Sequence, residues 1–127
     1  MNKELPKYVN GYVIPRFHWM MAHTPRRLRD IWDSGEFENY FSKIIEEGEI
    51  KTKRLLEGVV RDQRHASQIA AMLLEKIPEG ALTEQEKQDQ IDIKGQKITS
   101  DKILGKVKQE MVEARVFFWL KGAPMLY

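Results

Sequence analysis

The chain has 127 residues and a formal net charge of +2, with 31% charged and 42% hydrophobic residues. This size fits one domain over residues 1–127, and the composition excludes an intrinsically disordered chain. The absence of cysteine excludes disulfides, thiolate catalysis and thiolate metal ligands. It also fits a reducing compartment, so we expect a cytoplasmic protein. No run reaches the roughly 18 apolar residues of a membrane span, and the polar start is unlike a secretory signal.

Two elements are expected near the start of the chain. Asn10-Gly11 lies between β-branched and aromatic residues, which predicts a β-hairpin over about residues 7–14. Thr24-Pro25 is typical of a helix cap followed by proline at the first helical position, and Ser34-Gly35 would end that short helix. A helical body is therefore expected over about residues 24–120.

The most regular pattern of the sequence covers residues 36–77, where apolar residues recur every three or four positions and no proline intervenes. This spacing predicts a long amphipathic helix whose apolar face needs another surface to cover it. Gly48 and Gly58 lie inside the pattern, and each costs up to about 1 kcal/mol relative to alanine. The stretch is expected to form either one long helix or two helices that meet at a break or kink near Gly48.

Shorter elements are expected after Pro78. Thr83 and Glu86 have the spacing of a capping box, which predicts a polar, solvent-facing helix to about Gln90. Residues 91–99 alternate between apolar and polar types around a glycine, which indicates either a second small hairpin or an extended loop. A last helix is expected from about Ser100 to Leu120. The predicted fold class is mainly α: a small helical bundle with a long amphipathic helix and one or two short β-hairpins.

Residues with catalytic or metal-binding chemistry are sparse. His18 and His23 are five residues apart, which does not place them on one helix face. Asp62 and His65 form one carboxylate–histidine pair of the kind that helical di-iron sites use, but such sites need two pairs and further glutamates. No nucleophile motif or phosphate-binding loop is present. We therefore expect no enzyme, no metal and no cofactor, with a metal-dependent bundle enzyme as the weakest alternative.

Positive charge is concentrated near the start, where residues 1–35 contain six Lys and Arg against three acids. Arg26, Arg27 and Arg29 form its densest cluster. Guanidinium groups match carboxylates and phosphates, so this cluster predicts steering of an acidic protein partner. Aromatic residues nearby could stack on bases, and a nucleic-acid-binding protein is therefore the alternative from another class.

Large apolar side chains are numerous for a domain of this size. Aromatic residues and methionine are enriched at protein interfaces, because they bury much area and adapt their shape. The residues predicted to anchor such an interface are Trp19, Met20, Phe117, Phe118 and Trp119. Packing of the same residues in the core is the competing interpretation.

Gly11-Tyr-Val-Ile-Pro15, followed by Arg26-Arg-Leu-Arg29 and Ser34-Gly35, loosely resembles small accessory proteins of transposons. These motifs are short, and the resemblance assigns no role to any residue. The sequence favours a non-enzymatic binding protein that docks through an aromatic- and methionine-rich surface, either on itself or on another protein, with no membrane partner.

Overall fold

The computed structural model describes residues 10–113, which form helices joined by short connections and contain no β-strand. A small, mainly α domain is thus confirmed. The elements are α1 (Asn10–His23), α2 (Pro25–Asp33), α3 (Phe37–Glu57), α4 (Gln63–Glu75), the 3-10 helix η1 (Glu79–Ala81), α5 (Glu84–Lys94), α6 (Ser100–Leu104) and α7 (Lys106–Glu113). No helix among these is long and apolar enough to cross a lipid bilayer.

The hairpin predicted over about residues 7–14 is wrong, because residues 10–14 are the start of α1. Residues 7–9 lie outside the described part of the chain. The buried side chains of this helix are Tyr12, Val13, Phe17 and Met20. Their spacing places them on one helical face, where they reach the core together, whereas an isolated two-stranded ribbon is marginal in water. Burial of this face outweighs the backbone hydrogen bond that Pro15 removes inside the helix.

The second predicted hairpin is also wrong, because α5 continues through Lys94, beyond the end expected at Gln90. The backbone N–H groups of Gly95 and Gln96 then bond to the carbonyls of Ile91 and Ile93, which ends the helix in a turn. Residues 95–99 connect α5 to α6 without a strand. The alternation of residue types was too short to outweigh a helix already nucleated by a capping box.

The amphipathic pattern forms two helices, one of the two arrangements expected, and the break between them lies at Gly58 and not near Gly48. α3 is continuous across Gly48 because this glycine has a packing role. The Tyr12 ring of α1 lies against it so closely that a Cβ atom at Gly48 would be 2.5 Å from the ring Cγ. The Tyr12 hydroxyl also shares a 2.6 Å hydrogen bond with the Thr52 side chain, one turn further along α3. Gly48 therefore allows α1 to approach the backbone of α3.

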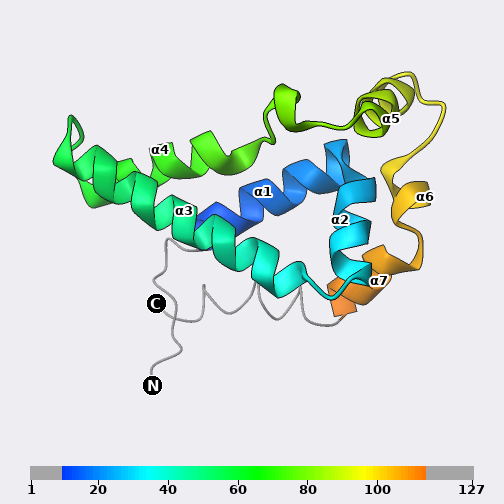
Figure 1. Ribbon diagram of the computed structural model, residues 1–127, viewed down its shortest axis with the longest axis horizontal. Helices are drawn as coiled ribbons and strands as arrows, with labels where there is room; N and C mark the ends of the chain where they lie inside the picture. The colour runs from blue at the N-terminus through cyan, green and yellow to red at the C-terminus, as the bar shows by residue number, and fades with distance from the viewer. Residues whose placement is uncertain (1–9, 114–127) are drawn as a thin grey trace.

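The helices pack around α1. Figure 1 shows α3 and α4 running side by side, with α1 against both and α2 crossing the end of α1. Phe17, Phe37 and Phe41 join α1 to α3 through ring contacts, with centroids 4.7 to 6.2 Å apart. The face of α4 that packs into this core is built from small residues, including Ala66 and Ala70, which are fully buried. Their size lets α4 pack closely on its neighbours.

Arg16 holds three helices together at the centre of this arrangement. It projects from α1 and donates from Nη1 to the Leu74 carbonyl at 2.6 Å, in the last turn of α4. It also donates from Nη2 to the Tyr40 hydroxyl of α3 at 3.1 Å, and its guanidinium lies 5.9 Å from the centre of the Tyr40 ring. A cation at this position satisfies a carbonyl that the end of α4 leaves without a helical partner.

The last helix, predicted over Ser100 to Leu120, is divided at Gly105. This residue has a φ of +57°, which glycine adopts readily, and it separates α6 from α7. The Thr99 side chain caps α6 by accepting the backbone N–H of Lys102. The remainder of the predicted helix lies outside the described residues.

Candidate functional site

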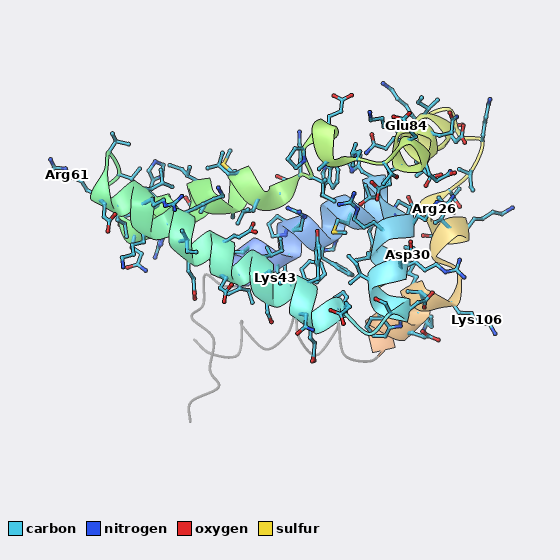
Figure 2. The ribbon with its side chains drawn as sticks, viewed as in Figure 1. Arg26, Asp30, Lys43, Arg61, Glu84 and Lys106 are labelled. Carbon is cyan, nitrogen blue, oxygen red and sulfur yellow. The ribbon has the colours of Figure 1, made fainter. Side chains whose placement is uncertain are left out.

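The two arginines at the start of α2 are paired with carboxylates of α5. Arg26 donates from Nε and Nη2 to the two oxygens of Asp89, at 2.9 and 3.1 Å. Arg27 donates from Nε and Nη2 to the two oxygens of Glu86, at 2.6 and 2.7 Å. Both pairs are bidentate, which is the arrangement that best matches the planar guanidinium. Figure 2 shows Arg26 at the end of α2 that faces α5.

The carboxylates are positioned by the local structure of α5. Glu86 and Asp89 are three residues apart and therefore lie on the same helical face. The capping box fixes Glu86, which accepts the backbone N–H of Thr83 and donates its own backbone N–H to the Thr83 hydroxyl. The amide of Gln85 donates to Asp89 at 2.9 Å. Both carboxylate residues are buried, at 4% and 3% exposure, whereas the Arg26 and Arg27 side chains are more open to solvent, at 43% and 25%.

This pairing shifts the pKa of all four groups. Hydrogen bonding from Arg26 lowers the pKa of Asp89, against the opposing effect of burial. Burial alone would raise the pKa of Glu86, but the hydrogen bonds from Arg27 and from the Thr83 backbone outweigh it, so the net shift is downward. Hydrogen bonding to these carboxylates raises the pKa of Arg26 and of Arg27. The arginines stay protonated under all ordinary conditions, so only the carboxylates respond to pH.

We expect the free energy of unfolding to decrease as the pH falls below about 4, the ordinary pKa of these carboxyl groups. Their pKa values are depressed in the folded state, so the stabilisation is fully present above the unfolded-state pKa and is lost as the pH falls through the folded-state pKa. Urea unfolding between pH 7 and pH 3 measures this dependence. At pH 7, Glu86→Gln should have a free energy of unfolding about 1.5–3 kcal/mol below that of the wild type. On acidification, its free energy of unfolding should decrease less than that of the wild type.

Glu84→Gln is the matched control, because Glu84 lies on the same helix with a side chain 92% exposed. This variant should follow the wild-type pH dependence. Equal pH dependence of Glu86→Gln and the wild type would contradict the prediction.

Arg29 is positioned differently from its neighbours. Its Nη1 donates to the carbonyl of Ile103 at 2.9 Å, which attaches α2 to α6. Its Nε lies 3.5 Å from an Asp33 carboxylate oxygen one turn along α2, in an exposed pair. The three predicted arginines thus lie together on α2, and each contacts other parts of the same chain.

The predicted apolar anchors do not form one described surface. Met20 is fully buried and belongs to the core, so in this fold it has no surface to offer a partner. Trp19 is half-buried and stacks on His23, with ring centroids 4.7 Å apart. Phe117, Phe118 and Trp119 lie outside the described residues, and their role stays a prediction.

A different apolar surface lies on α4. Met72 and Leu73 are 72% and 61% exposed, and Ile69 is half-buried beside them at helical spacing. We call Ile69, Met72 and Leu73 the α4 patch. The apolar pattern of residues 36–77 predicted one apolar face in need of cover and did not distinguish this second, exposed surface. The available signal was the pair Ala66 and Ala70, because small residues at this spacing identify the packed face and leave the larger residues outside.

The spacing of Asp62 and His65 is explained by a helix cap and not by a metal site. The Asp62 side chain caps α4 by accepting the backbone N–H of His65 at 2.9 Å. Among residues 10–113, no group of three or more His, Cys, Asp or Glu side chains is arranged to hold a metal ion.

Comparison of the chain with family models, with curated proteins and with solved structures found no significant match.

Proposed function

We propose that this protein is a non-enzymatic binding protein that docks another protein through the α4 patch. The observation that supports it is the exposure of Met72 and Leu73 on a helix whose opposite face already packs in the core. Burying such side chains contributes roughly 25 cal/mol for each Å² removed from water. A flexible methionine also adapts to the shape of a partner. A contiguous apolar surface of this kind is characteristic of interaction sites.

The charges around the patch favour a partner other than a second copy. Exposed His65 lies on α4 before the patch, and exposed Lys76, the residue that ends α4 in an extended conformation, follows the patch. Two copies packed in parallel through α4 would bring their Lys76 side chains near each other, which a different partner avoids. A partner helix with an apolar row and acidic residues beside it would complement both features.

The proposal is tested by site-specific photo-crosslinking from position 72, with position 68 as the matched control. Gln68 is exposed on the same helix but is polar. We expect position 72 to form a crosslink to a defined partner and position 68 to form much less. The partner is then purified and titrated against the wild type, Met72→Asp and Gln68→Asp. Met72→Asp should weaken binding at least tenfold, because a charge replaces an apolar contact, and Gln68→Asp should not.

Two results would contradict this assignment. One is equal affinity of the purified partner for the wild type and Met72→Asp. The other is a concentration-dependent dimer in sedimentation equilibrium that Met72→Asp dissociates, which would identify a second copy as the occupant.

Nucleic-acid binding through Arg26, Arg27 and Arg29 is the second candidate. Against it, two of these arginines already form bidentate pairs with carboxylates, which neutralises the charge that phosphates would need. Affinity for nucleic acid would fall steeply with salt, whereas binding through the mainly apolar α4 patch should change little.

A further inference from the structure

The segment from η1 to the start of α6 is attached to the rest of the domain by charge. We call residues 79–99 the α5 arm. Its only buried residues are Glu86 and Asp89, and its apolar side chains are half-buried or exposed, with Ile91 63% exposed. Apolar burial is the usual source of helix docking energy. In the arm, Leu82 packs partly buried against the core, and the two ion pairs and the Arg27 hydrogen bond to the Ala81 carbonyl supply further contacts.

The arm is also separated from its neighbours at both ends. Pro78 and Leu82 flank η1 in extended conformations, and residues 95–99 form a connection in which Gln96 has a φ of +62°. Figure 1 shows α5 at the edge of the molecule, joined to α4 and α6 by these connections. A unit held by few apolar contacts and bounded by non-helical links can open without unfolding the core.

The site that the arm covers is strongly cationic. Arg26 and Arg27 lie in the first turn of α2, where the helix dipole is positive and no acidic residue is present. Asp30, one turn further along α2, adds only a secondary attraction to Arg26. Glu86 and Asp89 supply the two missing negative charges, with Arg27 bound to one and Arg26 to the other. Their three-residue separation on one helix matches the side-by-side positions of the two guanidiniums.

We propose that the α5 arm is an electrostatic latch, and that Glu86 and Asp89 occupy in cis a site for an acidic helical segment of another protein. When the arm opens, Arg26 and Arg27 become free to bind two carboxylates presented three residues apart. The arginines are the more exposed members of both pairs, so a competing carboxylate can approach them before the arm has fully left. This surface is separate from the α4 patch and does not depend on it.

The first experiment measures opening by native-state hydrogen exchange. Glu86→Gln/Asp89→Asn removes both ion pairs, and Glu79→Gln/Glu84→Gln removes the same charge from exposed positions of the same arm. We expect the first variant to speed exchange of the α5 amides at least tenfold while the α3 and α4 amides change less than twofold. The control should match the wild type. Acceleration of α3, α4 and α5 together, or no acceleration of α5, would overturn the latch.

The second experiment measures binding with a labelled synthetic peptide of residues 79–99. The opened variant, Glu86→Gln/Asp89→Asn, should bind this peptide at least tenfold more tightly than the wild type does. A peptide carrying the same two substitutions should not bind, and adding Arg26→Gln/Arg27→Gln to the protein should abolish binding. Equal affinity of wild type and opened variant would overturn the proposal, as would tighter binding of a 15-nucleotide oligo(dT) than of the peptide, which would assign the site to nucleic acid.

Discussion

Replacing Gly48 by alanine is expected to lower the free energy of unfolding by about 2 kcal/mol, although alanine is the better helix former. An added Cβ would lie 2.5 to 2.7 Å from three carbon atoms of the Tyr12 ring. The ring cannot withdraw freely, because Tyr12 is fully buried and its hydroxyl is bonded to Thr52. Overpacking and loss of this hydrogen bond together outweigh the gain in helix propensity of up to about 1 kcal/mol.

Urea or thermal unfolding followed by circular dichroism measures this change. Gly80→Ala is the matched control, because no atom lies within 4 Å of a Cβ built at Gly80. The control should leave stability almost unchanged. If Gly48→Ala were as stable as the wild type or more so, α1 would not approach α3 as closely as described.

Replacing Arg16 by methionine is expected to cost about 2–4 kcal/mol, because it leaves the Leu74 carbonyl and the Tyr40 hydroxyl without their cationic donor. Methionine keeps most of the apolar stem of arginine. The decrease in the free energy of unfolding therefore measures the contribution of the guanidinium and not that of packing. Arg16→Lys should be intermediate, since a single ammonium cannot reproduce the fork that reaches both α3 and α4.

A double-mutant cycle with Tyr40→Phe tests the same contact. The two substitutions should be less than additive by about 0.5 kcal/mol or more, because each removes one side of the same hydrogen bond. Strict additivity would indicate that the Arg16–Tyr40 contact does not contribute to stability.

Local signals in the sequence predicted a large part of the helical framework. The capping box at Thr83 and Glu86 is formed as expected, because it depends on residues only three positions apart. The helical character of the amphipathic stretch was also predicted, but the position of its break was not. The prediction of a hairpin at Asn10-Gly11 was wrong, because its turn signal competed with the burial of one face of α1. The surface that buries this face comes from helices later in the chain.

The candidate site was less predictable, because its contacts join distant parts of the chain. Arg26 and Arg27 were recognised as a cationic pair, but their partners on α5 were assigned to solvent. A polar helix with two carboxylates on one face looks the same in sequence whether that face meets water or arginine. The packing role of Gly48 was missed for a related reason. Its low helix propensity indicates a place where a helix can break, whereas here its lack of a side chain makes room for the Tyr12 ring.

The central position of α1 affects how the chain folds during its synthesis. Its buried face is covered by α3 and α4, which follow it in the chain, and α5 and α6 add to its surroundings later still. During synthesis at about 5–20 residues per second, this apolar face therefore leaves the ribosome seconds before its cover exists. The nascent chain thus presents Tyr12, Val13, Phe17 and Met20 to chaperones before they can be buried. Folding of the domain cannot be completed one helix at a time from the N-terminus and has to await α4.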